Sequence, residues 1–207
     1  MKIGILDIQG SVEEHLEMLK KLKNVEAVLV KKSEDLKDVK GLILPGGEST
    51  TIGKLLRRFG LRDEIIKRVK KGMAVWGTCA GAILLSKKIV GKENADSLNL
   101  MDITVERNAY GRQLDSFETQ VEFDLSTKKS TEETDVLKKN TVRLCRIPAI
   151  FIRAPKILEV GKGVKILAKY KDEIIMAREK NMLVTTFHPE LTDDLEVHQY
   201  FVKMCGK

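Results

Sequence analysis

One cysteine stands between two glycines in the segment Trp76-Gly77-Thr78-Cys79-Ala80-Gly81. The segment follows an apolar run, residues 73–76, and precedes a helix-compatible run, residues 82–85. The spacing Gly-x-Cys-x-Gly matches the nucleophile elbow, a tight strand-to-helix turn whose glycines let other backbone pack closely. A thiol at a helix N-terminus forms its thiolate more easily. The pattern predicts a nucleophile at Cys79, with a buried structural cysteine as the alternative.

A cysteine nucleophile needs a base, and the sequence contains three histidines, at His15, His188 and His198. His188 belongs to Phe187-His188-Pro189-Glu190, directly after the predicted strand 182–186. Side chains at i and i+2 of an extended segment point the same way, and Pro189 favours extended backbone at His188. We therefore expect Glu190 to reach the imidazole and orient it as the third member of a triad. The other two histidines, in predicted helices, are interpreted as packed or surface residues.

Acyl transfer also needs donors for the developing oxyanion. The segment Leu44-Pro45-Gly46-Gly47-Glu48-Ser49-Thr50 leaves another predicted strand and offers backbone N–H groups without obstructing side chains. We predict Gly47 N–H and Ala80 N–H as the oxyanion donors; an ordinary Pro-Gly-Gly turn is the alternative. The segment lacks the Gly-x-x-x-x-Gly-Lys-[Ser/Thr] pattern of a phosphate loop.

Strands and helices must bring these segments together. In the first half, short apolar runs predict buried strands at 3–8, 27–30, 41–44 and 73–76. Helical patterns separate them, one opening at Ser11 with a capping box to Glu14 and another at 63–70. This order predicts an α/β fold, a mostly parallel open sheet with helices on both faces, in a single domain over residues 1–207. Such sheets place their sites at the carboxyl ends of the strands.

The second half carries more strand signals. Strands are predicted at 120–123, 149–153, 165–170, 174–178 and 182–186. Asp193 or Asp194 is expected to cap a closing helix. A polar stretch begins at Ser126, and residues 126–140 are expected to form a surface insertion.

Composition narrows the class of protein. The 37 Lys and Arg against 30 Asp and Glu give a net charge of +7, but the two signs are interleaved along the chain and aromatics make up 5%. We therefore expect no nucleic-acid partner. Three cysteines without a Cys-x-x-Cys spacing predict neither disulfides nor a metal site. No signal peptide or membrane span is expected, which predicts a cytoplasmic protein without a membrane partner.

Taken together, these motifs resemble the triad-type (class I) glutamine amidotransferases, and among them the glutaminase subunits of pyridoxal 5′-phosphate synthase. The resemblance covers nearly the whole chain. It rests on the elbow and on five ordered segments: Leu6-Asp7-Ile8-Gln9-Gly10 with Glu14-His15, Pro45-Gly46-Gly47-Glu48-Ser49-Thr50-Thr51, Arg107-Asn108-Ala109-Tyr110-Gly111-Arg112-Gln113, Phe151-Ile152-Arg153-Ala154-Pro155 and Phe187-His188-Pro189-Glu190-Leu191-Thr192.

The resemblance implies a flavodoxin-like fold and hydrolysis of L-glutamine to L-glutamate and ammonia, without a cofactor. It implies that the ammonia passes to a separate synthase subunit, which makes pyridoxal 5′-phosphate (vitamin B6), and that residues 9–15 face that partner. Cys79 would be the nucleophile, His188 the acid/base and Glu190 its orienting carboxylate. The implied glutamine-binding residues are Gly47, Glu48, Ser49, Arg107, Ile152 and Arg153.

Two alternative functions remain open. One is another enzyme on the same scaffold, either a glutaminase subunit for a different acceptor or a γ-glutamyl hydrolase. The other is a non-catalytic basic binding protein, for which the sequence lacks a basic stripe with interleaved aromatics.

Overall fold

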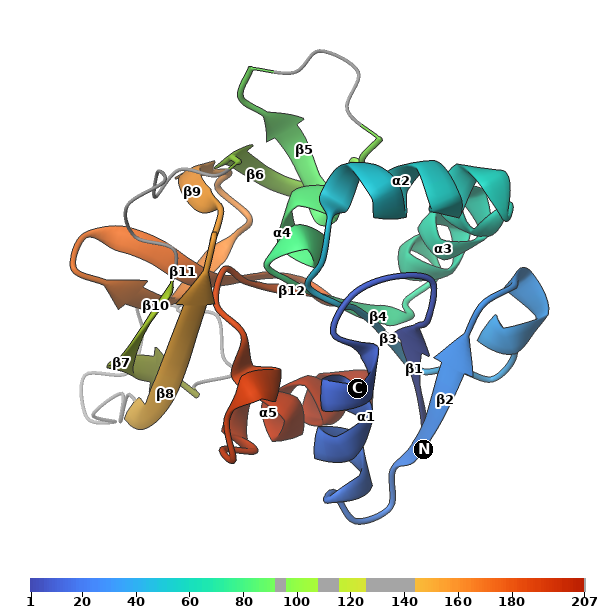
Figure 1. The fold of residues 1–207 in the computed structure, drawn as a ribbon, viewed down its shortest axis with the longest axis horizontal. Coiled ribbons are helices and arrows are strands. Elements are labelled where there is room, and N and C mark those ends of the chain that lie inside the picture. The colour runs from blue at the N-terminus through green and yellow to red at the C-terminus, as the bar shows by residue number, and fades with distance from the viewer. Residues whose placement is uncertain (92–95, 108–115, 126–143, 207) are drawn as a thin grey trace, which may run out of the picture.

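The computed structural model describes residues 1–91, 96–107, 116–125 and 144–206. Figure 1 shows the helices and strands in space. In chain order they are β1 (Lys2–Leu6), α1 (Val12–Lys20), β2 (Glu26–Val30), η1 (Ser33–Leu36), β3 (Gly41–Leu44), α2 (Ser49–Arg58), α3 (Leu61–Lys70), β4 (Ala74–Thr78), α4 (Ala80–Leu85), β5 (Ser86–Ile89), β6 (Met101–Glu106), β7 (Ser116–Asp124), β8 (Leu144–Ile152), β9 (Lys156–Val160), β10 (Lys165–Tyr170), β11 (Glu173–Glu179), β12 (Met182–Thr185), η2 (Pro189–Leu191) and α5 (Glu196–Cys205).

The described strands join in one sheet of order β2-β1-β3-β4-β12-β11-β10-β7-β8, with β5, β6 and β9 branching beside β11. The strands from β2 to β12 are parallel, as expected where helices connect successive strands. Beyond β12 the strands β11, β10, β7 and β8 add antiparallel pairs. The predicted α/β fold with a mainly parallel sheet is confirmed, and the second half extends it with antiparallel strands.

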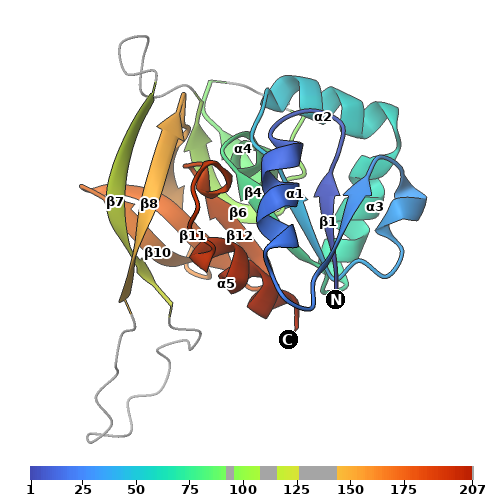
Figure 2. The same ribbon diagram turned by 60° about the horizontal axis from the view of Figure 1, so that its bottom comes forward.

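Helices cover both faces of the parallel strands. Helices α2, α3 and α4 lie on one face, and α1 and α5 on the other (Figures 1 and 2). Successive side chains of each strand point to opposite faces of the sheet and pack in two separate cores. Val75 of β4 packs in the core on the side of α2, α3 and α4, and Trp76 packs in the core on the side of α1 and α5. These strands are therefore buried on both faces, which explains their continuous apolar sequences.

Most predicted elements are present with bounds shifted by a few residues, and the strands 41–44 and 165–170 have the predicted bounds. Helix α2 and strands β5, β6 and β9 were not predicted from the sequence. The proposed insertion 126–140 lies outside the described residues. At the start of α5 the carboxylate of Asp194 accepts a hydrogen bond from Glu196 N–H at 2.8 Å, although the capping position itself is Leu195.

The predicted capping box at Ser11 is wrong. Ser11 occupies the N-cap of α1, but its side chain accepts no hydrogen bond from the helix backbone. The hydroxyl instead donates to Glu190 Oε1 at 2.7 Å, 179 residues further along the chain. A charge-assisted bond to a buried carboxylate is stronger than a local cap, and only the fold brings these two side chains together.

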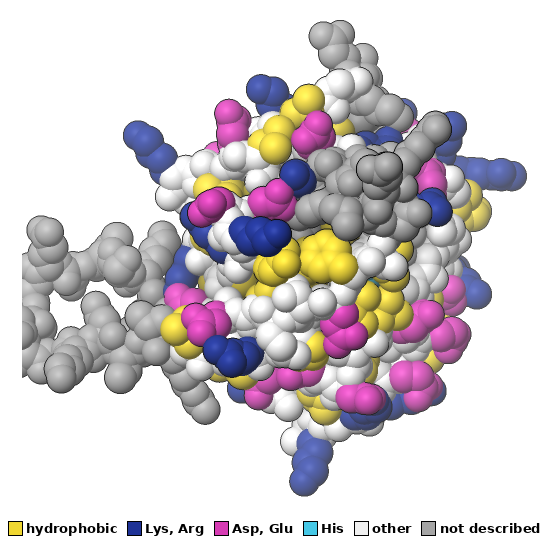
Figure 3. All heavy atoms as spheres, turned by 60° about the vertical axis from the view of Figure 1, so that its left-hand side comes forward, with side chains coloured by type: hydrophobic (Ala, Val, Ile, Leu, Met, Phe, Trp, Pro, Cys, Tyr) yellow, Lys and Arg dark blue, Asp and Glu magenta, His cyan; other side chains and the backbone are white. Residues whose placement is uncertain are grey.

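The visible surface carries mixed charge. On the face shown in Figure 3, Lys and Arg side chains are interspersed with Asp and Glu and form no basic stripe. In the described part of the chain no helix is both long and apolar enough to cross a membrane.

A substitution at Gly81 tests the close packing of α4 on the sheet. A Cβ at this position would collide with the carbonyl oxygen of Leu44 in β3. We predict that Gly81→Ala lowers the free energy of unfolding by about 1–3 kcal/mol, since backbone must move to make room. Urea unfolding measures the loss. The control is Gly206→Ala, where a Cβ meets nothing within 4 Å; equal stabilities of the two variants would contradict the packing.

Candidate active site

Cys79 occupies the turn between β4 and α4. Its backbone has φ 47° and ψ −99°, a conformation that residues other than glycine rarely adopt. The peptide N–H donates to the carbonyl oxygen of Thr185, the last residue of β12, at 2.8 Å. The neighbouring parallel strand therefore holds the strained turn, and the side chain lies at the carboxyl edge of the sheet.

The glycines on either side of Cys79 are required by close packing, as the sequence pattern predicts. A Cβ at Gly77 would collide with the backbone of Gly81, and one at Gly81 would collide with Leu44. The turn can therefore fold back on itself and on β3 only where side chains are absent. The geometry is that of a nucleophile elbow.

His188 approaches Cys79 from the neighbouring strand. It follows β12, and its N–H donates to the carbonyl oxygen of Ile150 in β8 at 2.8 Å. Its imidazole lies close enough to the Cys79 side chain for the thiol to raise the imidazole's pKa. On its other side lies Gly46, where a Cβ would collide with the ring. The ring is therefore held between the nucleophile turn and the Gly46-Gly47 loop.

Glu190 completes the line of three side chains. His188 Nδ1 donates to Glu190 Oε1 at 2.8 Å, as predicted. The route differs from the prediction, because Pro189 and Glu190 belong to the short 3₁₀ helix η2 and not to extended backbone. One 3₁₀ turn brings the carboxylate back under the ring. The structure thus brings Cys79, His188 and Glu190 together.

The electrostatics favour an ion pair between His188 and Glu190. Burial opposes both charged forms, but hydrogen bonds to Cys79 and Glu190 raise the pKa of His188 to about 10. At Glu190, which is 4% exposed, burial is outweighed by His15 and by the bonds from His188 and Ser11, which lower its pKa to about 2. The carboxylate therefore stays ionised and stabilises an imidazolium next to the thiol.

The Gly46-Gly47 loop is bonded to the segment before α1. Ser11 N–H donates to the carbonyl oxygen of Gly46 at 3.0 Å, and Glu48 N–H donates to Gln9 Oε1 at 2.8 Å. A Cβ at Gly47 would lie 2.7 Å from the same Gln9 oxygen. The two predicted oxyanion donors therefore come from this loop and from Ala80, the first residue of α4.

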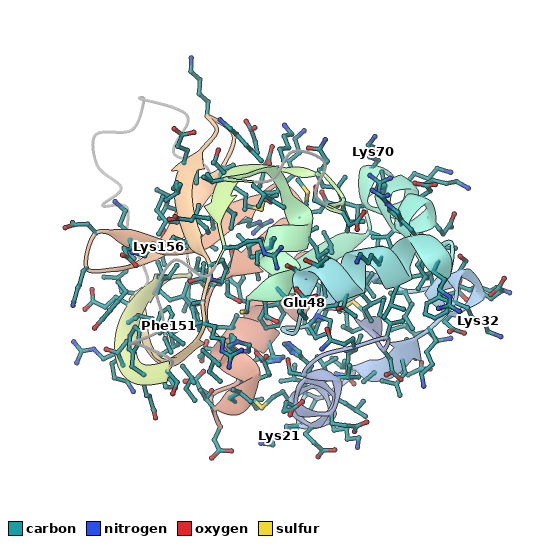
Figure 4. The ribbon with its side chains drawn as sticks, turned by 45° about the horizontal axis from the view of Figure 1, so that its top comes forward. Lys21, Lys32, Glu48, Lys70, Phe151 and Lys156 are labelled. Atoms are coloured by element: carbon teal, nitrogen blue, oxygen red, sulfur yellow. The ribbon has the colours of Figure 1, made fainter. Side chains whose placement is uncertain are left out.

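Glu48 and Arg107 form a pair at the start of α2. Glu48 caps the helix by accepting from the N–H groups of Thr50 and Thr51 at 3.1 and 2.6 Å. Arg107 donates to Glu48 Oε1 and to Thr50 Oγ1, each at 3.0 Å. Burial opposes the charge, but the bonds from Thr51 and Thr50 together outweigh it and lower the pKa of Glu48 to about 2. Figure 4 shows Glu48 at the start of this helix.

The remaining predicted residues lie at two places. Ser49 is buried as the first residue of α2. Ile152 ends β8, and its carbonyl oxygen lies 3.9 Å from Cys79 Sγ. Arg153 follows in a left-handed conformation, with φ 45°, and is exposed. The end of β8 therefore faces the nucleophile.

The polar contacts of Ser11, Thr78, His15 and His198 were not predicted from the sequence. Ser11 and His15 are four residues apart, one helical turn, and both contact Glu190. That spacing was a usable signal, but it identifies no partner. His15 and His198 were expected to be packed or surface residues, and both are packed, since each is 0% exposed. His15 therefore presents no side chain to a partner protein.

The side chains described here gather no group of three or more His, Cys, Asp or Glu that could hold a metal ion. The chemistry available at this site is that of a thiol, an imidazole and a carboxylate in sequence, next to backbone N–H groups.

Comparison with known proteins agrees with this geometry. Residues 5–207 match the SNO glutamine amidotransferase family. The chain belongs to that family. It is 50% identical over 206 residues to the pyridoxal 5′-phosphate synthase subunit PdxT of Pseudothermotoga lettingae, covering 100% of this chain and 96% of the relative. It is 48% identical over 202 residues to the PdxT of Clostridium botulinum, covering 98% and 96%.

A solved structure of the family extends the likeness to the fold. The crystal structure of a glutamine amidotransferase is 43% identical, covers 99% of both chains and superposes with a TM-score of 0.87. A likeness over this length includes both the parallel half and the antiparallel half of the sheet. The fold implied by the sequence resemblance is therefore that of the family.

The ion pair of the site predicts an unusual titration. We expect the His188 imidazole to remain protonated at about pH 8, because its pKa is raised to about 10. The linked stability is fully present below the ordinary pKa of 6.5 and is lost as pH rises through about 10. In Glu190→Gln the loss should begin at lower pH.

Nitrogen-15 NMR titration of the histidine rings and urea unfolding across this pH range measure the two effects. The internal control is His15, whose pKa burial lowers, so that it should stay neutral at the same pH. A His188 ring that titrates near 6.5 would contradict the ion pair.

Proposed function

We propose that this protein is a glutaminase that hydrolyses L-glutamine to L-glutamate and ammonia and delivers the ammonia to the synthase subunit of a pyridoxal 5′-phosphate synthase. The observation that carries the proposal is the line from Cys79 through His188 to Glu190 in a chain of this amidotransferase family. The identity of about half the chain to pyridoxal 5′-phosphate synthase subunits of other organisms supports the synthase partner. The proposal keeps the cytoplasmic location predicted from the sequence.

In the first half-reaction the Cys79 thiolate attacks the carbon of the glutamine side-chain amide. The tetrahedral oxyanion accepts hydrogen bonds from the N–H groups of Gly47 and Ala80, and each such donor contributes about 10²–10³-fold in rate. His188 gives its proton to the departing nitrogen as the carbon–nitrogen bond breaks. Ammonia leaves, and a γ-glutamyl thioester remains on Cys79.

In the second half-reaction a water molecule loses a proton to His188 and attacks the thioester. The carbon–sulfur bond breaks, which releases glutamate and restores the Cys79 thiolate and the protonated His188. Glu190 holds the imidazole in one orientation throughout, since His188 Nδ1 lies 2.8 Å from its carboxylate. One water is consumed, and no cofactor enters the balance.

The substrate site lies between α2 and the end of β8. Arg107 keeps donors beyond its bonds to Glu48 and Thr50, and a guanidinium binds a carboxylate well. It would hold the α-carboxylate of glutamine, with Glu48 near the ammonium group. The other proposed contacts with glutamine come from Gly47, Ser49, Ile152 and Arg153.

The synthase partner would dock on the exposed residues before and along the start of α1, where Gly10, Glu13 and Glu14 reach solvent. This segment is bonded to Gly46 and Glu48. A partner that shifts it would move the Gly46-Gly47 peptide, a pair that changes conformation at low cost. Docking would thereby complete the oxyanion site only when an ammonia acceptor is present.

The test is glutamate release from L-glutamine with and without the cognate synthase subunit. Activity that rises on adding the synthase subunit is the expected result. Equal activity in both samples would reject control by the partner. If neither sample releases glutamate but γ-glutamyl peptides are cleaved, the protein is a hydrolase on the same scaffold and the proposal is wrong.

Replacement of the nucleophile tests the covalent mechanism directly. We predict that Cys79→Ala lowers turnover by at least about 10⁴-fold, because no thioester can form. Glutamine binding, measured by calorimetry, should persist. The matched control is Cys205→Ala at the end of α5, which should keep wild-type turnover. Residual glutaminase activity in Cys79→Ala above this limit would remove Cys79 as the nucleophile.

The substrate role of Arg107 has a different kinetic signature. We predict that Arg107→Ala raises KM for glutamine roughly 10–100-fold and lowers kcat less, because a charge-assisted bond to the bound carboxylate is lost. Initial rates over a range of glutamine concentrations separate the two constants. The control is Arg146→Ala, which removes another Arg–Glu pair, on β8. A fall in kcat at constant KM would remove Arg107 from the substrate site.

A further inference from the structure

Two buried histidines lie behind the triad, and the mechanism above uses neither. His15 in α1 and His198 in α5 place their facing nitrogens, Nδ1 and Nε2, 3.0 Å apart. The other nitrogen of His15, Nε2, lies 3.2 Å from Thr78 Oγ1 and 3.6 Å from Glu190 Oε2. The edges and faces of both rings pack against Trp76, with centroids 5.3 and 4.8 Å away.

Two buried atoms of this cluster lack a hydrogen-bond partner in the described structure: Glu190 Oε2 and His198 Nδ1. Orphaned buried N–H groups are rarer in folded proteins than buried acceptors without a full set of partners. His198 Nδ1 is therefore the bare nitrogen, and its proton is on Nε2. The His198 Nε2–H then donates to His15 Nδ1.

This assignment determines the proton of His15. With Nδ1 accepting, the proton is on Nε2 and points toward Thr78 Oγ1 and Glu190 Oε2. The opposite tautomers would bury an unpaired N–H at His198 and turn the lone pair of His15 toward the Glu190 carboxylate. Both consequences are unfavourable, so one arrangement of the two protons fits the geometry.

Both rings also stay neutral. Burial lowers the pKa of His15, against the opposing effect of Glu190 and Glu14 and with a further lowering by His188. Burial and His15 lower the pKa of His198, while Glu190 opposes and Lys21 adds to the lowering. The pair therefore acts through oriented N–H groups and carries no net charge of its own.

We propose that His15, oriented by His198, is a positioning residue of the triad, and that its Nε2–H donates to Thr78 Oγ1, 3.2 Å away, and faces Glu190 Oε2, 3.6 Å away. The electrostatic attraction between this N–H and Glu190 Oε2 favours the orientation in which Oε1 faces His188. The bond to Thr78 ties the same ring to the residue before Cys79. His15 thus contacts both ends of the triad, at Thr78 beside Cys79 and at Glu190. Ser11, at the N-cap of the same helix, contacts Oε1. This inference rests on the proposed glutaminase function.

The first test needs no variant and no activity. Long-range proton–nitrogen NMR of the histidine rings in the wild-type protein reports which ring nitrogen carries each proton. Neutral Nε2–H tautomers at both His15 and His198 near neutral pH are expected. An Nδ1–H tautomer or a charged ring at His15 would overturn the inference.

The second test measures coupling to Glu190 in glutaminase assays with the synthase subunit present. His15→Leu should lower kcat roughly 10–100-fold with KM nearly unchanged, because the carboxylate loses its orientation. His15→Gln, which restores an N–H, should recover most of the loss. In a Glu190→Gln background His15→Leu should lower kcat by less than about threefold, because His15 acts through Glu190.

The matched control is Leu19→Ala, another buried residue of α1 that packs in the core below the sheet. It should lower the thermal unfolding midpoint and leave kcat unchanged, so that there is no loss of kcat to recover. The positioning role would be rejected if His15→Leu lowered kcat equally in both backgrounds. It would also be rejected if a folded His15→Gln variant recovered none of the lost kcat. A wild-type protein that releases no glutamate would reject the glutaminase proposal instead, and the NMR result would still decide the proton arrangement.

Discussion

The buried carboxylate of Glu190 is the group on which the site depends. Removing a charge from water is costly unless polar groups surround it, and here the hydrogen-bond donors Ser11 and His188 and the nearby His15 come from elements far apart in sequence. Ser11 precedes α1, His15 lies within it, and His188 follows β12. The ion pair with His188 can form only when the sheet has brought these elements together, so the chemistry requires the complete fold.

A second constraint acts at the nucleophile. The left-handed backbone of Cys79 is unfavourable in isolation. It is held by a hydrogen bond to Thr185 and by glycine contacts that admit no side chain. Strands β4 and β12 are adjacent and parallel, so their carboxyl ends deliver the thiol and the imidazole to the same edge. The antiparallel half contributes β8, whose end at Ile150 and Ile152 contacts both residues.

Local patterns explain why much of this could be predicted from the sequence. The glycines around Cys79 and the short path from His188 to Glu190 are encoded within a few residues. Contacts over long separations are not: Ser11 matches a capping box, yet its hydroxyl binds Glu190. Helix α2 was missed because its start, Glu48-Ser49-Thr50, has turn-like composition, although Glu48 caps it. His15 and His198 could be interpreted as packed, but their pairing depends on α1 and α5 meeting on one face of the sheet.

The central claim is that Cys79 carries the glutamyl group during turnover. Rapid acid quenching of the protein with its synthase subunit and L-glutamine, followed by peptide mass spectrometry, tests this claim most directly. The account predicts one γ-glutamyl group on the peptide containing Cys79, absent in Cys79→Ala. Release of glutamate and ammonia with no adduct on that peptide, or with the adduct on another residue, would contradict it.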